Sequence, residues 1–301
     1  MRIGLNGSAT LLQADLDAVV TDVEQAAQAG FTSYWLAQTS AVDALTALAV
    51  AGAKGVTGDM ELGTAVVPTF PQHPLSMAAR AWTAQAATGK LVLGIGLSHE
   101  PTVRERLGMV WEKPVRHMRE YLEILNGLFQ AGAADQDGEV WSAHAEMGLK
   151  TPPPKVMVAA LGPQMLQLAG RLADGTILWM VGPKTIGGHI APTIRQAAAD
   201  AGRGEPSVVC SLPICVTDTP GPVRDLAAAV FSNYGELPSY RAMLDREGAD
   251  GPADVCIIGD QAHVSGVLDD LAAAGTTDFA ALEFPTNDDE RAATRALLLS
   301  R

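Results

Sequence analysis

The sequence AALGPQM at residues 159–165 contains a group of residues suited to binding an anion. An apolar run ends at Ala160, Gly162 permits a tight turn, and Pro163 suits the first position of a helix. The unpaired amides of a first helical turn carry the positive end of the helix dipole, so they can bind a phosphate. An ordinary strand-to-helix turn would use the same residues, and the local sequence leaves both interpretations open.

A second group of candidate residues surrounds Gly94 and Gly96, at the end of the apolar run 91–95. These glycines could relieve crowding inside a sheet, or they could let a flat ligand lie against the backbone. His99 and Glu100 follow directly. His99 is a candidate for the wall of a pocket, because it lies just beyond the carboxyl end of a predicted strand.

Other titratable residues near strand ends are few. His73 lies in a loop, and Glu283 lies between two apolar residues, so a buried Glu283 would need a partner. No Ser-His-Asp arrangement, pair of carboxylates or metal-ligand spacing is evident. The three cysteines occupy apolar runs and indicate reduced, buried thiols (Cys210, Cys215 and Cys256). A site with so few catalytic acids suggests that a cofactor performs the chemistry.

Apolar runs that alternate with amphipathic stretches indicate the fold. They predict eight strands, at residues 2–6, 32–37, 62–67, 91–95, 155–159, 176–180, 207–216 and 278–284. Helical patterns separate most of these strands, and this alternation predicts an α/β protein with a (β/α)8 TIM barrel. A doubly wound sheet is the alternative. We expect one domain over residues 1–301, with irregular insertions near 98–113, 135–150 and 231–252.

Composition limits the possible partners. The chain has 301 residues, of which 48% are hydrophobic, and a formal net charge of −13. Such a chain should repel nucleic acid and anionic membranes, since both demand basic patches. No apolar run approaches the roughly 18 residues that a membrane span requires. The amino-terminal MRIGLNGS does not resemble a signal peptide, so we expect a cytoplasmic protein that acts on a small molecule.

The segment LGTAVVPTFPQHPLSMAARAWTAQAATGKLVLGIG resembles the luciferase-like flavin and deazaflavin oxidoreductases. KPVRHMREYLEILNGLF is similar to the next helix of that family, and VCIIGDQAHVSGVLDDLAAAGTTDFAALEFP to its carboxyl-terminal unit. The block ALGPQMLQLAGRLADG is the most specific. It resembles the members that use coenzyme F420, the 8-hydroxy-5-deazaflavin. This resemblance implies a TIM barrel, usually a homodimer, with the cofactor at the carboxyl ends of the strands.

The resemblance also implies site residues. A non-prolyl cis peptide at Ala65–Val66 would support the cofactor ring, and the amides around residues 162–165 would bind its phosphate. The implied cofactor-binding residues are Gln38, Thr64, Ala65, Val66, Gly96, Leu97, Ser98, Ala160, Leu161, Gly162, Pro163, Gln164, Met165 and Trp179. No metal is implied.

Two departures from the family pattern concern proton transfer. Many members carry an acid-His pair after the second strand, where this chain has Gln38 and Thr39. Sugar-phosphate-oxidising members have a Glu where this chain has Leu97, so that activity is disfavoured. Gln38 can form a hydrogen bond with a ring but cannot transfer a proton at neutral pH. His99 is therefore the candidate proton donor, with Gln38 as a second candidate catalytic residue.

These observations favour an oxidoreductase that transfers a hydride between coenzyme F420 and a small organic substrate. Three alternatives stay open: an FMN-dependent monooxygenase, a deazaflavin-binding protein without catalysis, and a non-redox phosphate-binding barrel. Lys184 and Arg104 are candidates for contact with an acidic coenzyme tail. Four apolar residues could form a substrate pocket or could simply be packed (Val67, Phe70, Trp111 and Trp141).

Overall fold

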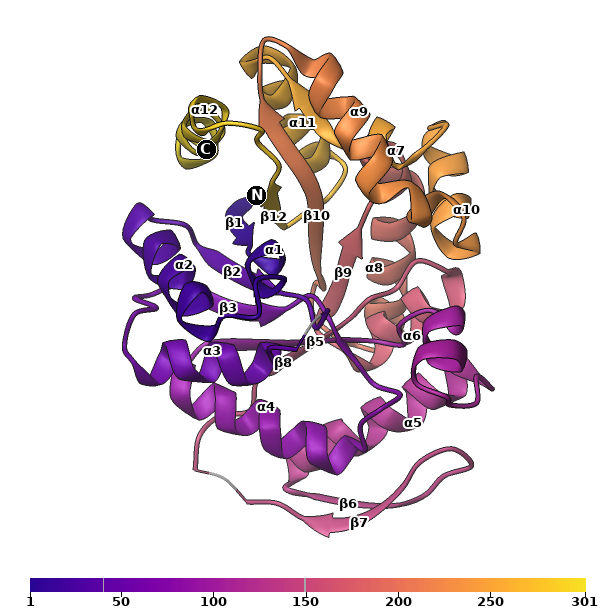
Figure 1. The fold of residues 1–301 in the computed structure, drawn as a ribbon. Helices are drawn as coiled ribbons and strands as arrows, with labels where there is room; N and C mark the ends of the chain where they lie inside the picture. The colour runs from indigo at the N-terminus through magenta and orange to yellow at the C-terminus, as the bar shows by residue number, and fades with distance from the viewer. Residues whose placement is uncertain (40, 149) are drawn as a thin grey trace.

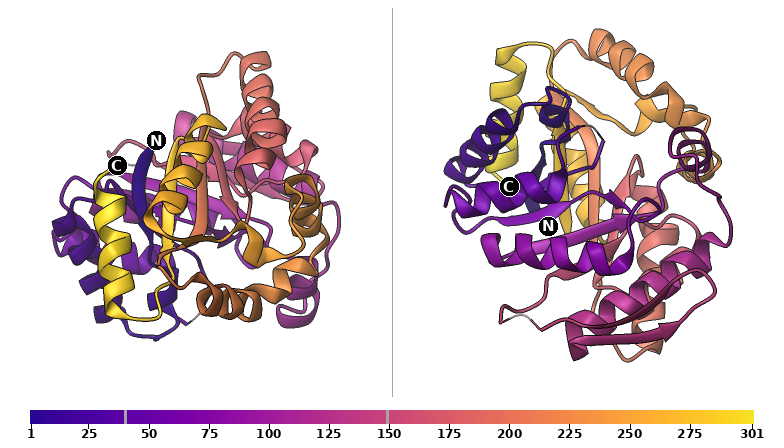
Figure 2. Two further views of the ribbon diagram at one scale, coloured as in Figure 1. Left: turned by 90° about the horizontal axis from the view of Figure 1, so that it is seen from above. Right: turned by 60° about the horizontal axis from the view of Figure 1, so that its bottom comes forward.

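The computed structural model describes residues 1–39, 41–148 and 150–301. Within these residues, eight parallel strands form a closed barrel (Figures 1 and 2). β10 pairs with both β9 and β12, and this pairing closes the sheet and excludes the doubly wound alternative. In order around the barrel the strands are β1 (Arg2–Asn6), β2 (Ser33–Leu36), β3 (Glu61–Thr64), β5 (Leu91–Gly96), β8 (Lys155–Val158), β9 (Gly175–Trp179), β10 (Ser207–Val216) and β12 (Asp278–Glu283).

Helices surround this barrel, and the two chain termini lie near one another in every view (Figures 1 and 2). The helices are α1 (Ser8–Leu11), α2 (Leu16–Ala29), α3 (Ala44–Ala53), α4 (Pro74–Thr88), α5 (Pro114–Asn126), α6 (Pro163–Leu172), α7 (Pro183–Thr185), α8 (Ala191–Asp200), α9 (Pro220–Phe231), α10 (Pro238–Glu247), α11 (Gln261–Ala273) and α12 (Asp288–Leu299). The βα alternation of the sequence is thus confirmed.

The first long helix shows how local sequence sets these elements. The Asp15 carboxylate accepts hydrogen bonds from two amides at the start of α2, and Gly30 ends the helix at φ 96°. The buried residues follow the helical repeat expected from the sequence (Val19, Val20, Val23 and Ala26).

The structure departs from a simple βα alternation at three places. Residues 62–67 form two strands, β3 and β4 (Val67–Pro68), separated by a cis peptide at Ala65–Val66, as the resemblance implies. β11 (Ile257–Gly259) pairs with the end of β10 and lies outside the barrel. The segment 183–201, between β9 and β10, is helical but is divided by a π-helical turn, because Pro192 cannot donate the backbone hydrogen bond that a continuous α-helix needs.

A hairpin of β6 (Ala133–Asp137) and β7 (Ser142–Glu146) lies along the outside of α4 and α5 (Figure 1). The carboxylate of Glu120 on α5 holds its tip by accepting three backbone hydrogen bonds, from the amides of Glu139 (3.1 Å), Val140 (2.7 Å) and Trp141 (2.9 Å). The hairpin lies in the stretch near 135–150 where the sequence predicts an irregular insertion.

The barrel interior is packed around Trp35, which is fully buried. Residues from five other strands complete this apolar cluster (Val92, Met157, Ile177, Val209 and Ala280). Gly63 lies against the indole: a Cβ added there would come within 2.3 Å of Cζ3 of Trp35. The ring therefore fills space that only a glycine leaves free.

We expect Gly63→Ala to lower the free energy of unfolding by about 1–3 kcal/mol, since overpacking forces Trp35 from its place. Urea unfolding of both proteins would measure this difference. Gly221→Ala is the matched control, because an added Cβ at Gly221 has no neighbour within 4 Å. Equal losses of unfolding free energy in the two variants would show that the packing of Trp35 does not require a glycine at position 63.

Charged residues form a network at the amino ends of the strands. Arg2 donates to Asp278 (2.5 Å) and Glu61 (2.9 Å), and Lys155 donates to the other oxygen of Glu61 (3.2 Å). Asp278 is only 2% exposed. In TIM barrels this end serves stability, whereas ligands bind at the opposite end.

No helix among the described residues is both long enough and apolar enough to cross a membrane.

Candidate active site

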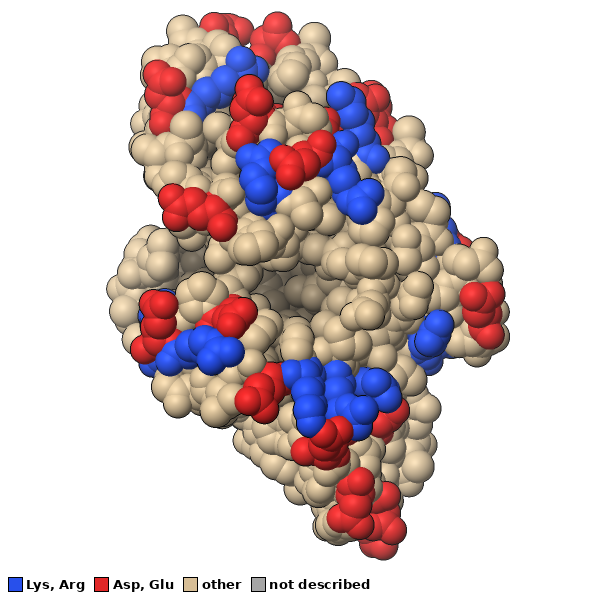
Figure 3. Space-filling model, turned by 90° about the vertical axis from the view of Figure 1, so that its right-hand side faces the viewer, with Lys and Arg blue, Asp and Glu red and all other residues tan. Residues whose placement is uncertain are grey.

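The carboxyl ends of the barrel strands form the candidate active site, which we call the mouth. The segment after β5 lies on the right-hand side of Figure 1 with α6 and α10, so Figure 3 views this side of the molecule. A hollow opens there between two groups of charged side chains, and its visible walls are neither acidic nor basic (Figure 3). The mouth therefore presents uncharged walls to a ligand.

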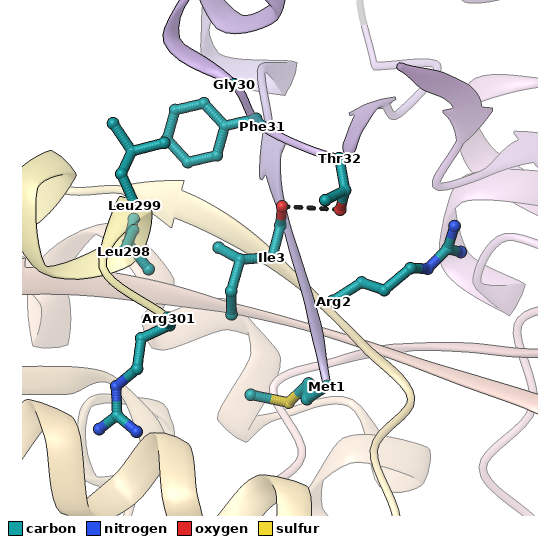
Figure 4. Close-up of a pocket in the computed structure, with 9 residues that line it drawn as sticks. All are labelled: Met1, Arg2, Ile3, Gly30, Phe31, Thr32, Leu298, Leu299 and Arg301. Atoms are coloured by element: carbon teal, nitrogen blue, oxygen red, sulfur yellow. Dashed lines mark hydrogen bonds between the residues drawn. The ribbon is translucent and has the colours of Figure 1, made fainter. Parts of the chain in front are cut away.

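A separate cavity of about 200 Å³ lies near the chain termini (Figure 4). Its lining comes from the amino ends of β1 and β2 and from the end of α12 (Met1, Arg2, Ile3, Gly30, Phe31, Thr32, Leu298, Leu299 and Arg301). The Thr32 hydroxyl donates to the Ile3 carbonyl, and Arg301 is paired with Asp269. This cavity belongs to the end of the barrel that serves stability.

The start of α6 is an anion-binding feature at the mouth. Gly162 is its N-cap and Pro163 its first residue, and no side chain caps the helix. Gly162, Pro163 and Gln164 are exposed, and an added Cβ at Gly162 would have no neighbour within 4 Å. The amides of Gln164 and Met165 lack an intrahelical partner by their position, so they can donate to an anion.

One edge of the mouth brings Val66, Gly96 and Gln38 together. The Gln38 amide donates to the Val66 carbonyl (3.1 Å). A Cβ added at Gly96 would come within 2.8 Å of Cγ2 of Val66 and 3.2 Å of Cβ of Ala159. The lack of a side chain at Gly96 thus allows the segments that contain Val66, Gly96 and Ala159 to approach each other.

Gly94 has a purely structural reason to be glycine. A Cβ at this position would lie 1.8 Å from the Thr64 carbonyl oxygen and 2.4 Å from Cδ1 of Ile177. Of the two interpretations of this glycine, crowding inside the barrel is the one that the structure supports.

The floor of the mouth is a neutral hydrogen-bond network. Nδ2 of Asn6 donates to the Ser211 hydroxyl (2.9 Å), which donates to the Ala280 carbonyl (2.7 Å). Oδ1 of Asn6 accepts from the amide and hydroxyl of Ser8, and the Ser8 hydroxyl accepts from the Ala37 amide (2.8 Å). None of these side chains ionises, so they can orient a ligand but not exchange a proton with it.

Two of the predicted cofactor-binding side chains bind the protein itself. Oε1 of Gln38 accepts from the Ala44 amide (2.8 Å), and its Nε2 donates to the Val42 carbonyl (3.3 Å). The Thr64 hydroxyl donates to the Gly94 carbonyl (2.8 Å) and accepts from the Gly94 amide (2.9 Å). Gln38 thus holds the start of α3, and Thr64 joins β3 to β5.

The other predicted site residues differ in exposure. Gly96 and Ala160 are buried, like Thr64. The residues of intermediate exposure are Ala65, Val66, Leu97, Ser98, His99, Leu161, Met165 and Trp179. The structure places them on the loops and strand ends after β3, β5, β8 and β9, which surround the mouth.

His99 contacts the insertion that follows β10. Its ring lies 5.6 Å from the ring of Tyr240 on α10, and burial lowers the pKa of His99 below its usual value. Tyr240 contacts Tyr234, and Tyr234 contacts Trp179 at the end of β9. Aromatic side chains therefore connect the segment after β5 with α10 along one side of the mouth.

Charged groups near the mouth are largely paired within the protein. Arg104 donates to Glu100 (2.7 Å), and Glu283 accepts two hydrogen bonds from Arg295 (2.8 and 2.7 Å), the partner that its burial requires. The carboxylate of Glu247 accepts from the Lys184 amide (3.1 Å) at the start of α7. At the start of α7, an anion would compete with the Glu247 carboxylate for the backbone amides. At the start of α6, no side chain caps the helix.

The chain matches a family of known proteins over most of its length. A family model described as luciferase-like monooxygenase covers residues 3–281. This chain belongs to the luciferase-like monooxygenase family. Members of this family are oxidoreductases or monooxygenases.

Three known proteins illustrate the range of the similarity. The 5,10-methylenetetrahydromethanopterin reductase of Archaeoglobus fulgidus is 36% identical over 130 residues, which is 42% of this chain and 39% of that protein. An F420-dependent secondary alcohol dehydrogenase has a similar structure, with a TM-score of 0.80, 15% identity and coverage of 98% and 97% of the two chains. The oxygenating constituent of 3,6-diketocamphane monooxygenase from Pseudomonas putida, in complex with FMN, has a TM-score of 0.73 at 18% identity, covering 99% and 96%.

Sequence reasoning missed His117 in this luciferase-like barrel. His117 lies on α5, is 2% exposed, and its Nε2 is 2.9 Å from the Thr69 hydroxyl. Thr69 in turn donates its backbone amide to the Gly96 carbonyl (2.9 Å) at the mouth. The sequence does contain a signal for His117: a titratable residue occurs on the apolar face of an amphipathic stretch, four residues before Tyr121.

The stability of the protein should depend on the protonation of His117. Burial lowers the pKa of His117 from 6.5 to about 4. The unfolded chain therefore binds more protons than the folded protein between pH 4 and 6.5. The free energy of unfolding should fall as the pH decreases through this window, by roughly 1–3 kcal/mol after allowance for solvent screening.

Urea unfolding at several pH values, for wild type and His117→Phe, would measure this contribution. We expect the pH dependence to be weaker in the variant, because Phe cannot bind a proton. Burial of His99 acts in the same direction in both proteins and cancels in the comparison. Parallel curves for the two proteins would contradict the assignment to His117.

Proposed function

We propose that this protein is an oxidoreductase that transfers a hydride between coenzyme F420 and a small organic substrate. The observation that carries the proposal is the uncapped start of α6, whose exposed amides are available to an anion beside a mouth with uncharged walls. The relative with 36% identity named above is a reductase, and one structural neighbour is F420-dependent. Coenzyme F420, when bound, would supply hydride exchange at C5 of its deazaflavin ring.

The residues present fit the cofactor. The amides of Gln164 and Met165 would hold its phosphate, because no side chain of α6 occupies them. Ala65, Val66 and Gly96 would line the ring, with Leu97, Ser98 and Trp179 at its edges. The small side chains on this wall leave room for a planar group. The Lys184 ammonium is the proposed partner of an acidic tail, which would have to pass the Glu247 carboxylate at the start of α7.

The chain's own contribution would be orientation and the exclusion of water. Asn6, Ser8 and Ser211 form a fixed floor of hydrogen bonds. Gln38 would act through α3 and the Val66 carbonyl, to which its backbone amide donates. His99 is the proposed proton donor. Its pKa is lowered by burial, so the ring would be mainly neutral at neutral pH and would donate a hydrogen bond, while only its imidazolium form would transfer a proton.

A parallel titration with F420 and FMN, each followed by its fluorescence, tests the proposal. We expect saturable binding of F420 in the micromolar range and binding of FMN at least tenfold weaker. Tight binding of FMN with no binding of F420 would favour the monooxygenase alternative instead. The homodimer and the cytoplasmic location implied by the sequence are also proposals, and light scattering of the purified protein would test the homodimer.

A further inference from the structure

A second cavity, of about 230 Å³, lies beside the mouth, and we call it the side pocket. Its walls are Phe70, Val110 and Val140, its one buried polar residue is His117, and Glu112, Lys113 and Glu139 form its rim. The lining thus comes from the loop after β4, the segment before α5 and the tip of the β6–β7 hairpin. Of the four apolar residues that the sequence offered for a substrate pocket, Phe70 lines the side pocket.

The imidazole of His117 is fixed in the wall of the side pocket. It is stacked on Phe70, with ring centres 4.2 Å apart, and it is nearly perpendicular to the ring of Trp141, with centres 5.1 Å apart. Its Nε2 pairs with the Thr69 hydroxyl (2.9 Å). The other nitrogen, Nδ1, makes no hydrogen bond with a described residue. It is also not one of the described polar atoms that are both fully buried and unpaired, so it is accessible from the pocket that the ring lines.

The volume of the side pocket limits the ligand. A cavity of about 150 Å³ is enough to bind benzene, whereas sites for drug-sized ligands measure about 300–1,000 Å³. A pocket of about 230 Å³ therefore suits a single ring with one small substituent, and it is too small for the tricyclic deazaflavin.

The charges at the rim favour an uncharged ligand. Lys113 and Arg116 both form ion pairs with Glu139, so the two cations share one carboxylate that lies between them. Glu112 adds a further negative charge at the rim. Burial keeps His117 neutral at neutral pH, since its pKa is lowered to about 4. The two cations, Lys113 and Arg116, and the two carboxylates, Glu112 and Glu139, sum to zero charge, so the rim favours neither an anionic nor a cationic ring.

The side pocket is connected to the cofactor wall through one residue. The Thr69 hydroxyl, which pairs with His117, also lies 3.3 Å from the Gly96 carbonyl, and the Thr69 amide donates to the same carbonyl (2.9 Å). A ligand on Nδ1 of His117 is therefore two hydrogen bonds away from the wall that would face the cofactor.

We propose that the side pocket binds the non-reacting part of the substrate, an uncharged single ring whose hydrogen-bonding substituent contacts Nδ1 of His117. The assignment to the substrate rests on the proposed oxidoreductase function, whereas binding in the pocket does not. His117 is then a specificity-determining residue for that function.

Nuclear magnetic resonance of the cofactor-free protein tests this proposal, with phenol, toluene and benzoate as probes. In the wild type we expect phenol to shift the imidazole ¹⁵N signals of His117 and the Thr69 amide, and to bind at least fivefold more tightly than toluene or benzoate. In His117→Phe the preference for phenol over toluene should disappear.

His73→Phe is the matched control. His73 also contacts Trp141, at 5.4 Å, but does not line the pocket. This variant should keep the preference for phenol. Unshifted His117 signals in the wild type, or an unchanged preference in His117→Phe, would overturn the proposal. Binding of phenol without binding of F420 would contradict the proposed function alone, and the reverse result would contradict the side pocket alone.

Discussion

We expect Gly162→Asp to weaken the binding of F420 by at least about 100-fold without destabilising the protein. An aspartate at this N-cap would accept hydrogen bonds from the free amides of α6 and would repel a phosphate. Each hydrogen bond to a charged group contributes about 1.5–3 kcal/mol, so the loss of two corresponds to roughly 10²–10⁴ in the dissociation constant. The space around Gly162 accommodates the new side chain, since an added Cβ has no neighbour within 4 Å.

Fluorescence titration and thermal unfolding of the same samples would separate these effects. The melting temperature should stay the same or rise, because an N-cap carboxylate stabilises a helix. Gly162→Asn caps the helix without charge and should give an intermediate affinity. Gly221→Asp, on the exposed start of α9, should leave the affinity unchanged. Wild-type affinity in Gly162→Asp would show that the phosphate binds elsewhere.

Arg2→Met should have the opposite pattern, with a loss of about 3 kcal/mol in the free energy of unfolding and an unchanged affinity for F420. The free energy of unfolding should fall because Asp278, which is 2% exposed, would lose its charged partner. Removing one partner of a buried ion pair costs about 3–5 kcal/mol. The affinity should be maintained because Arg2 lies at the amino ends of the strands, at the opposite end of the barrel from the mouth.

Urea unfolding and F420 titration of Arg2→Met would check both parts. Lys54→Met is the matched control, since it removes an exposed pair with Asp17 and should cost less than about 1 kcal/mol. If folded Arg2→Met bound F420 more weakly than the wild type, the two ends of the barrel would not be independent.

Much of the fold could be predicted from the sequence because its signals are local. Apolar runs such as residues 207–216 match β10 at both ends, and Gly30 ends α2 where expected. β8 begins directly after the triple proline at 152–154, so the βα alternation of the sequence continues past it.

The features that could not be predicted depend on contacts between distant residues. β11 resembles a barrel strand in sequence, yet its pairing with the end of β10 places it outside the barrel. The Gln38 side chain could have faced a ligand, but the position of α3 gives its amide group two backbone partners.

The candidate site divides in the same way. The start of α6 was predictable, because Gly162 and Pro163 carry a local signal for an N-terminus. The side pocket was predicted only in part. Phe70 was a candidate for a substrate pocket, but His117 is 47 positions away and their stacking depends on how α5 packs on the barrel. The apolar residues Phe70 and Trp111 proved to be stacked on each other, with ring centres 5.0 Å apart.

A crystal structure of the protein with F420 would test the central claim most directly. We predict that the phosphate oxygens will lie within hydrogen-bonding distance of the Gln164 and Met165 amides, with the deazaflavin ring against Ala65, Val66 and Gly96. A phosphate bound away from the start of α6, or a ring outside the mouth, would contradict this account of the site.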